Sequence, residues 1–373
     1  MSELRKTALN AMHRSMKAKM VDFGGWDMPV EYSGLIAEHN AVRNGVGIFD
    51  VSHMGDIQLR GPGSLAAVQY LLMNDASKLQ VGQAHYSAML TPEGTFVDDV
   101  VLHKLSENDY LIVINAGTRE KDVQWIRKTI GQMPGTHISD YSDMYTQIAI
   151  QGPKAADVLR KLTDTDLSTI KNYWFTWGKV CGLYNVMIAR TGYTGEDGFE
   201  IYIPSDVATS ERVWKEILEA GAEFGILPCG LGARNTLRLE AAMALYGHEI
   251  SDTINVFEAG LGRYCKLEKE ADFVGKQSLL EIQAAGGPRR KLVGLEMVDR
   301  GIARDGYPVV SPSGEEIGLV TSGSPSVTLK KNIALAYVPL QFAEPGTEIA
   351  VMIRNSPVKA VVVPTPFYKR AKR

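Results

Sequence analysis

Cysteine is scarce in this chain, which contains only three in 373 residues. Cys181, Cys229 and Cys265 are far apart and form no CxxC pair, so neither a disulfide framework nor a zinc knuckle is predicted. Three reduced thiols are typical of a cytosol-like compartment. We therefore expect the protein in the cytoplasm, or in the mitochondrial matrix if its source is eukaryotic.

Long apolar runs and an excess of one charge are also missing. No apolar segment approaches the ~18 residues of a membrane-spanning helix, and residues 1–20 lack the apolar core of a signal peptide. The formal net charge is -3, from 40 basic and 43 acidic residues. These properties favour neither a membrane protein nor a nucleic-acid-binding protein.

The sequence motifs of several enzyme classes are absent as well. The chain has no GxxxxGK[ST] loop and no GxSxG motif, and residues 230–235 (GLGARN) form only half of a dinucleotide-binding fingerprint. The seven histidines are scattered without HExxH spacing, so we expect neither a protein-bound metal nor a nucleotide cofactor. A site in this protein must therefore rest on carboxylates, arginines and aromatic residues.

Two blocks of strand and helix patterns occupy most of the chain. Residues 47–62 read as strand, turn and strand, and residues 50–130 follow the order β-α-β-β-β-α. This order predicts an antiparallel sheet with helices on one side. A second α/β block follows, and its last helix is predicted over residues 232–247, closed by Gly247.

The last part of the chain has a different pattern. Residues 284–291 (AAGGPRRK) have the composition of a linker, and the short strands with close turn signals after them are typical of a small β-barrel. We therefore predict an α+β protein. Its two α/β lobes lie in residues 1–283, one of them over about 50–135, and its β-barrel lies in residues 284–373.

Two adjacent aspartates occur in the strand-like segment 94–103 (GTFVDDVVLH). Because side chains alternate along a strand, Asp99 and His103 share one face and Asp98 points to the other. A buried carboxylate needs a partner or a function, and Tyr86 lies on the neighbouring hairpin strand. Alternation alone does not show which aspartate faces inward. The alternative to a functional buried acid is a pair of aspartates solvated at the surface.

A glycine-rich hairpin loop in residues 190–201 (RTGYTGEDGFEI) is the second candidate. Its glycines allow tight turns or the close approach of a ligand, and Tyr193 at its tip is suited to stacking. Glu200 follows in the next strand, where its carboxylate can accept two parallel hydrogen bonds from a ring with adjacent N–H donors. A solvated carboxylate on an open strand face is the alternative.

A basic residue near the start of a predicted helix is the third candidate. Arg234, in residues 229–240 (CGLGARNTLRLE), lies in the first helical turn. A cation there opposes the helix dipole at a cost of roughly 0.3–1 kcal/mol. A positive charge in that position, beside backbone N–H groups, indicates an anion site. An ion pair with a neighbour such as Glu240 is the alternative.

These segments occur in an order that resembles one family. From about residue 5 to residue 368 the chain is similar to the aminomethyltransferases (T-proteins) of the glycine cleavage system, within the superfamily of folate-dependent aminomethyltransferases and demethylases. The motifs that carry the resemblance are KMVDFGGWDMP, VGIFDVSHMGDI, GTFVDDVV, AIQGPKA, RTGYTGEDGFEI, GLGARNTLRLEAAMALYG and VTSGSPSVTLKKNIALAYV.

The resemblance implies a three-lobed fold, in which two α/β lobes form a folate-binding module and a small β-barrel follows. It implies an enzyme of glycine catabolism that transfers the one-carbon unit of aminomethyl-dihydrolipoyl H-protein to tetrahydrofolate, giving methylenetetrahydrofolate and ammonia. Tetrahydrofolate is then the co-substrate and lipoylated H-protein the partner, with no metal, nucleotide, nucleic acid or membrane. We expect a monomer in isolation.

The same resemblance assigns roles to individual residues. It implies that Asp99, the second of the paired acids, is the essential carboxylate and that Glu200 binds the pterin. It also implies that Arg234 contacts the folate and that Tyr86 and Tyr193 line the folate site.

Some positions depart from the family pattern. His103 stands where tyrosine is common near the folate, so it is a weaker candidate for a folate contact, and Thr95 and Lys330 stand where glycine is common. The C-terminal tail, which ends in Lys372 and Arg373, is more basic than the family requires. These two residues are candidate contacts for an acidic carrier or a folate tail, and a solvated tail is the alternative.

Two other functions remain open. A folate-dependent demethylase with a sulfonium or aryl-ether methyl donor shares the scaffold and Glu200, although the retained acid pair favours aminomethyl transfer. A non-catalytic folate-binding protein belongs to a different class, and the presence of Asp99, Glu200 and Arg234 argues against it.

Overall fold

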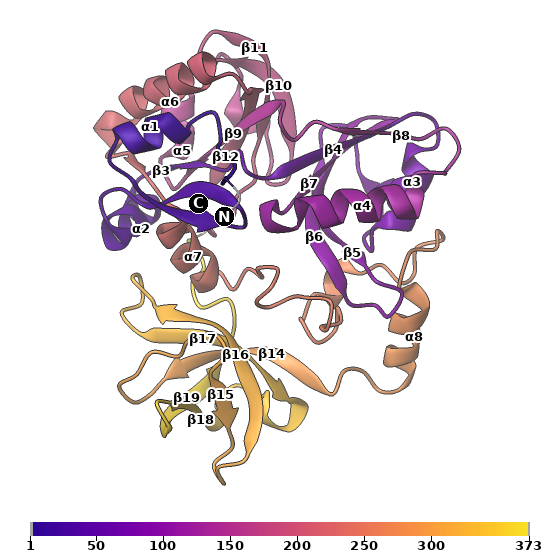
Figure 1. Cartoon of the computed structure of the whole chain (residues 1–373), viewed down its shortest axis with the longest axis vertical. Helices are drawn as coiled ribbons and strands as arrows, with labels where there is room; N and C mark the ends of the chain where they lie inside the picture. Colours follow the sequence, from indigo (N-terminus) through magenta and orange to yellow (C-terminus); the bar gives the residue numbers. More distant parts are fainter. Residues whose placement is uncertain (1–2, 372–373) are drawn as a thin grey trace. The chain divides into compact units, whose positions relative to one another are not determined.

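The computed structural model describes residues 3–371, which form two compact units. Within the described residues, the first unit contains 3–68, 76–86 and 100–235, and the second contains 69–75, 87–99 and 236–371. We describe each unit by itself, with elements labelled as in Figure 1. The boundary between residues 283 and 284 stays a prediction.

The first unit contains a six-stranded sheet. In spatial order its strands are β10 (Phe175–Val180), β11 (Leu183–Ala189), β12 (Gly198–Pro204), β9 (Tyr145–Gln151), β3 (Gly47–Asp50) and β13 (Leu227–Pro228). The helices that pack against its apolar side chains are α1 (Asn10–Ser15), α5 (Ala155–Leu159) and α6 (Val207–Gly221). Asp206 begins α6 by accepting a hydrogen bond from the Thr209 amide at 2.8 Å, and the fully buried Trp214 anchors the helix in the core.

A five-stranded sheet carries the first predicted block. In spatial order its strands are β5 (Ala84–Leu90), β6 (Phe96–Ser106), β7 (Asp109–Ile114), β4 (Gly55–Arg60) and β8 (His137–Asp140), and its helices are α3 (Ser64–Leu71) and α4 (Arg119–Ile130). The elements β4, α3, β5, β6, β7 and α4 follow one another along the chain, so the predicted β-α-β-β-β-α order is confirmed. β8 is an additional strand, antiparallel to β4.

The two strands predicted in residues 47–62 both form, but in different sheets. β3 pairs with β9 in the six-stranded sheet, whereas β4 pairs with β7 and β8 in the five-stranded sheet. The four residues between β3 and β4 therefore connect the six-stranded sheet to the five-stranded sheet.

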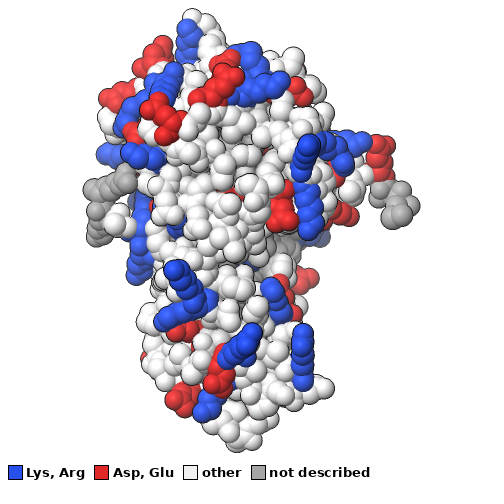
Figure 2. Space-filling view, turned by 90° about the vertical axis from the view of Figure 1, so that its left-hand side faces the viewer, with Lys and Arg blue, Asp and Glu red and all other residues white. Residues whose placement is uncertain are grey.

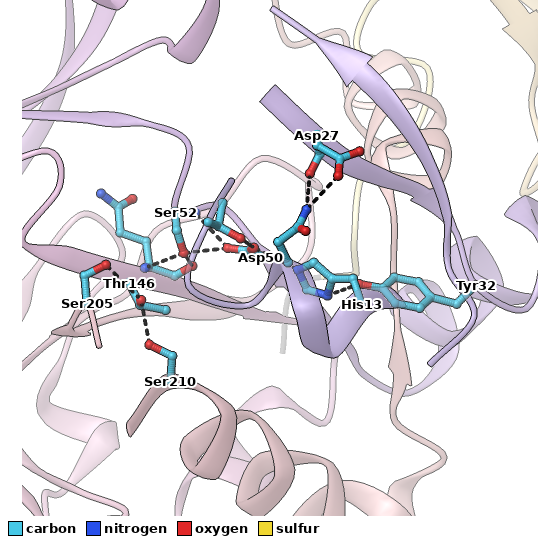
Figure 3. A network of polar contacts seen from close by, with 11 residues as sticks. His13, Asp27, Tyr32, Asp50, Ser52, Thr146, Ser205 and Ser210 are labelled. Carbon is cyan, nitrogen blue, oxygen red and sulfur yellow. Dashed lines mark hydrogen bonds and ion pairs between the residues drawn. The ribbon is translucent and has the colours of Figure 1, made fainter. Parts of the chain in front are cut away.

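A buried polar network surrounds Asp50 at the end of β3 (Figure 3). Its Oδ2 accepts hydrogen bonds from Thr7 Oγ1 at 2.7 Å and His13 Nε2 at 2.9 Å, and Ser52 Oγ donates to Oδ1 at 2.5 Å. His13 Nδ1 lies 2.8 Å from the Tyr32 hydroxyl. Burial alone raises the pKa of Asp50, but these hydrogen bonds and the adjacent imidazole lower it to about 2. The ionised carboxylate thus joins α1 to β3.

The second unit contains a closed six-stranded barrel. In order around the barrel its strands are β14 (Arg290–Met297), β17 (Asn332–Pro339), β16 (Glu316–Pro325), β15 (Pro308–Val310), β18 (Glu348–Ile353) and β19 (Ser356–Val363). β14 closes it by pairing with both β17 and β19, and alternating apolar residues such as Leu295 and Val351 fill the interior. The predicted α+β class with a C-terminal β-barrel is confirmed. Helix α8 (Lys276–Ala284) precedes the barrel.

Helix α7 (Leu231–Glu240) is shorter than predicted. Its expected extension to Gly247 is wrong, because Ala242 adopts a left-handed φ of 52° and the Met243 amide turns back to the Arg238 carbonyl at 2.9 Å. The apolar residues after Glu240 continue a helical pattern in the sequence without continuing the helix.

The remaining elements of the first unit lie near the N-terminus. β1 (Lys19–Phe23) and β2 (Trp26–Glu31) form a hairpin, and α2 (Leu35–Asn44) follows it. None of the helices within residues 3–371 combines the length and the apolar character needed to cross a bilayer. The three cysteines are buried free thiols, as predicted. On the face drawn in Figure 2, basic and acidic side chains are interspersed.

Candidate active site

The loop between β11 and β12 is held on both sides by ion pairs. Arg190 binds Asp197 with two hydrogen bonds of 2.9 and 2.5 Å, which close the base of the loop. From α2, Arg43 donates to the Thr194 carbonyl at 2.7 Å and to Glu196 at 3.0 Å, and the Arg43 and Glu196 side chains are only 3% and 5% exposed. Bidentate and buried charge pairs restrict motion, so the loop presents its tip on a fixed frame.

The glycines of this loop serve the packing of one side chain. A Cβ on Gly192 would lie 2.0 Å from Gln151 Oε1, and Gly195 adopts a φ of 79°, which favours glycine. The Gln151 amide fills this space, donating to the Thr191 carbonyl at 3.0 Å and accepting from Thr194 Oγ1 at 2.9 Å. The sequence predicted the tight turn but not Gln151 as its anchor.

Glu200 lies in β12 with a half-buried side chain. The hydroxyl of Thr191 donates a hydrogen bond to Glu200 Oε2. Burial raises the pKa of Glu200, while the Thr191 hydrogen bond and the positive charge of Arg234 oppose that rise. Glu200 is thus a carboxylate at low dielectric, where hydrogen bonds from a ligand are strong. Nothing in the sequence singled out Thr191, which is separated from Glu200 by the whole loop.

Arg234 lies in α7 and covers the aromatic ring at the loop tip. Its guanidinium carbon is 4.5 Å from the centroid of the Tyr193 ring, the distance of a cation–π contact. The carboxylate of Glu240, the predicted alternative partner, accepts hydrogen bonds from Ser326 and Thr328 at 2.6 and 2.7 Å. The structure therefore brings together Glu200, Arg234 and Tyr193 in the first unit.

His53 adjoins this group and was not predicted from the sequence. Its ring is 1% exposed, and neither ring nitrogen has a hydrogen-bond partner within residues 3–371. Burial, together with the charge of Arg234, lowers the pKa of His53 to about 4, so the imidazole is neutral. The ring stands edge-on to Phe23 at 5.6 Å. The motif DVSHMG contained this residue, but a single histidine in a turn gave no signal of burial.

His103 lies in an aromatic cluster rather than on an open surface. It is 1% exposed and stands edge-on to Phe175 at 5.4 Å and to Tyr202 at 6.3 Å. Burial lowers the pKa of His103 to about 4. Tyr202 shares a strand face with Glu200, so His103 packs against the same face of the sheet that carries Glu200. Its role as a folate contact stays a prediction, as does that of Tyr86, which lies half-buried in β5.

The paired aspartates lie in β6 and face opposite ways, as alternation predicts. Asp99 is half-buried, whereas Asp98 is 0% exposed. The alternative of a solvated surface pair is therefore wrong, because Asp98 is enclosed and its neighbours Val97 and Val100 are also buried. Asp98 is the enclosed acid, and Asp99 is the one with solvent access.

Of the other positions that depart from the family pattern, two have a local structural context and two lie outside the described residues. Thr95 Oγ1 hydrogen bonds to Thr91 Oγ1 at 2.7 Å across the β5–β6 turn. Lys330 has a φ of 56°, a backbone conformation that favours glycine, which accounts for the glycine common at this position. Lys372 and Arg373 lie outside the described residues.

Glu200, Arg234 and Tyr193, here called the Glu200 group, have a defined chemical character. The group combines a half-buried carboxylate that accepts hydrogen bonds, a cation and an aromatic ring within one unit, and ion pairs hold the loop that carries the ring. These groups suit a planar heterocycle with adjacent N–H donors that carries an anionic substituent. Within residues 3–371 no three His, Cys, Asp or Glu side chains are placed to hold a metal ion.

Comparisons with known proteins agree with this character. A family model described as the GCVT N-terminal domain matches residues 9–269, and one described as the glycine cleavage T-protein C-terminal barrel domain matches residues 290–369. The chain belongs to the glycine cleavage T-protein family. Its enzyme class is that of the aminomethyltransferases, which are one-carbon transferases, and a demethylase activity is not favoured.

Several members of the T-protein family are similar over their whole length. An aminomethyltransferase of Acidobacterium capsulatum is 73% identical over 370 residues, covering 99% of this chain and 97% of the relative. One of Koribacter versatilis is 64% identical, covering 100% and 98%. Among solved structures, the glycine cleavage system aminomethyltransferase T from Bartonella henselae has a TM-score of 0.91 at 31% identity, covering 98% of each chain.

Proposed function

We propose that this enzyme takes the aminomethyl group carried by the dihydrolipoyl arm of H-protein and passes its one-carbon unit to tetrahydrofolate, giving methylenetetrahydrofolate and ammonia. The observation that supports this most is the arrangement of Glu200, Arg234 and Tyr193 in one unit of a T-protein-family chain. We further propose lipoylated H-protein as the partner, a monomeric state in isolation and a cytoplasmic location.

The residues of the Glu200 group divide the work of binding. Glu200 accepts hydrogen bonds from the amino and ring N–H groups of the pterin, and Thr191 holds one carboxylate oxygen in place. Arg234 binds an anionic or carbonyl part of the folate, while Tyr193, fixed beneath the guanidinium, offers a ring face. Because the loop is held by ion pairs at its base and side, little ordering is needed on binding.

Asp99 is the proposed catalytic carboxylate. It is half-buried, so a reacting group can reach it, whereas Asp98 is enclosed. A carboxylate at this position can accept the proton released as the folate nitrogen attacks, or stabilise a cationic carbon by its charge. Both roles require an ionised side chain, and both are lost in an asparagine variant.

Folate-dependent release of ammonia tests the proposed reaction. Purified enzyme is mixed with aminomethyl-loaded H-protein, with and without tetrahydrofolate, and ammonia and methylenetetrahydrofolate are measured. We expect both products in equal amounts and only when folate is present. Folate binding without ammonia release would instead favour a non-catalytic folate-binding protein, and methyl transfer from a sulfonium or aryl ether would favour a demethylase.

Replacing Glu200 with glutamine tests the pterin contact. Hydrogen bonds to a charged group are worth about 1.5–3 kcal/mol, so Glu200→Gln is expected to raise the Kd for tetrahydrofolate about 10- to 100-fold. Calorimetry or fluorescence titration measures this. Glu219→Gln is the matched control, because Glu219 is exposed on α6, and its Kd is expected to stay at the wild-type value. Equal affinities for all three proteins would refute the assignment.

A further inference from the structure

Asp56 is a buried acid outside the residues discussed so far. It lies in β4 with 0% exposure, between the two sheets of the first unit. Its backbone is held by Ser142 Oγ, which accepts from the Asp56 amide at 2.9 Å, and by the Tyr141 amide, which donates to its carbonyl at 2.8 Å. The backbone of Asp56 is therefore held in place on both sides. Alternation placed Asp56 on the polar face of β4, and only the second sheet covers it.

The hydrogen bonds of the carboxyl group are few. Oδ2 contacts the side-chain amide of Gln147 in β9 at 2.5 Å, and Oδ1 has no hydrogen-bond partner within residues 3–371. An ionised carboxylate can accept about four hydrogen bonds, so one neutral amide donor leaves most of its acceptor capacity unmet at this buried site.

The charges around Asp56 disfavour a second negative charge. Arg119 in α4 is engaged by Asp143 at 2.9 Å and by Asp140 in β8 at 3.6 Å. Burial raises the pKa of Asp56 well above its ordinary range, and Asp140 and Glu200 add to the rise against the opposing effects of Gln147 and Arg119.

The neutral phenols of Tyr145 and Tyr202 also face Asp56, and its negative charge would raise their pKa values further. The carboxyl group is thus surrounded by two acids, two phenols, an amide and one shared cation. An ionised Asp56 lacks the partners that a buried charge requires.

Asp56 is coupled to Glu200 through the six-stranded sheet. Tyr202 in β12 pairs with Gln147 in β9, and Glu200, two residues earlier in β12, pairs with Ala149. The Gln147 side chain, which contacts Asp56, therefore lies on the neighbouring strand and on the same face of the sheet as the Glu200 side chain. A charge on Asp56 would act directly on Glu200.

We propose that Asp56 is held as a neutral carboxylic acid and is a positioning residue, which keeps the sheet face that carries Glu200 free of a second negative charge so that Glu200 stays ionised for its ligand. This inference rests on the proposed role of Glu200 in binding the pterin. The protonation state of Asp56 can be measured without any folate, so the two proposals can fail separately.

The first test compares the pH dependence of unfolding for the wild type and Asp56→Asn, a neutral variant of the same shape. An acid whose pKa is higher in the folded protein than in the unfolded protein stabilises the fold. This stabilisation is fully present below the unfolded-state pKa of about 3.9, and it is lost as the pH rises through the folded-state pKa. We therefore expect the stability of Asp56→Asn relative to the wild type to increase steadily as the pH rises above about 5, until the raised folded pKa of Asp56 is passed. A variant that is less stable by a constant amount above about pH 5 would overturn the proposal, because Asp56 would then be ionised.

The second test is spectroscopic. Infrared spectra of protein with isotope-labelled aspartate should show the C=O stretch of a protonated carboxylic acid near neutral pH, and this band should be absent from Asp56→Asn. If that variant does not fold, Asp140→Asn serves instead, because removing a neighbouring negative charge lowers the pH at which the band disappears. A wild-type spectrum without such a band would overturn the proposal.

The third test addresses the effect on the site. As Asp56 ionises at alkaline pH, the wild-type Kd for tetrahydrofolate, measured without oxygen, should rise about 3- to 30-fold more than that of Asp56→Asn. If the acid band is present but the Kd of the wild type and that of Asp56→Asn change with pH in the same way, Asp56 is not a positioning residue for Glu200. A protein with the acid band but no folate binding at any pH would contradict the proposed function and leave the neutral state of Asp56 established.

Discussion

Replacing Asp99 with asparagine is expected to lower kcat by about 10²- to 10⁴-fold, the usual contribution of a positioned general acid or base. The side chain keeps its size, so the Kd for tetrahydrofolate should change by less than about threefold. Asp99 is half-buried in β6, so its replacement by asparagine, which has the same shape, buries no new charge. Steady-state ammonia release and a separate folate titration give the two values.

Asp98→Asn is the matched control, since it makes the same chemical change one residue away. Asp98 is 0% exposed, so its substitution should act on the fold and lower the free energy of unfolding by about 1–3 kcal/mol. The kcat per folded molecule should remain within about threefold of the wild type. If Asp98→Asn abolishes turnover in folded protein while Asp99→Asn does not, the roles of the two acids are exchanged.

Removing Arg238 is expected to produce the largest loss of stability in the second unit. Arg238 is 1% exposed, and its guanidinium donates to Glu249 at 2.6 Å and to Ser322 in β16 at 2.8 Å. Glu249 is 0% exposed and also accepts from Thr321 at 2.8 Å. Arg238→Met leaves this buried carboxylate without its cation, so it should lower the free energy of unfolding by about 3–5 kcal/mol.

The measurement must report on the second unit alone. All five tryptophans, at positions 26, 125, 174, 177 and 214, lie in the first unit, so tryptophan fluorescence does not follow the barrel. Hydrogen exchange of amides in β16 and β17, measured as a function of denaturant, does. Replacing both members of the pair, as Arg238→Met with Glu249→Leu, should recover most of the loss, because no lone charge then remains.

Arg290→Met is the matched control for the buried pair. Arg290 binds Glu258 at 2.8 Å, but its side chain is 42% exposed, and exposed ion pairs contribute about 0–1 kcal/mol. A loss of similar size for Arg238→Met and Arg290→Met would show that burial of the Arg238 pair does not set its contribution.

Local patterns in the sequence predicted much of the fold. The order of elements in residues 50–130, the glycine-rich hairpin before Glu200 and the barrel strands after residue 284 all form as expected. Each depends on contacts between neighbours in the chain, such as alternation along a strand or a turn that favours glycine. The order of motifs along the chain was sufficient to indicate the T-protein family.

Other features depend on which segments meet, and no local pattern reports this. β3 and β4 are four residues apart yet join different sheets, and the second sheet is what buries Asp56. The helical pattern of α7 continues past Glu240, but the chain turns at Ala242, near the buried pair of Arg238 and Glu249.

Neighbouring residues set propensity and alternation, so the family, the order of strands and helices and the position of Glu200 on a strand after a tight loop could all be predicted without the structure. The tertiary structure decided which of Asp98 and Asp99 is enclosed, which residues hold Glu200 and Arg234, and that Asp56 lies between two sheets. The physical reason is that burial and charge environment depend on distant segments packing together, and a carboxylate in a polar position of a strand is solvated or enclosed according to what covers that face.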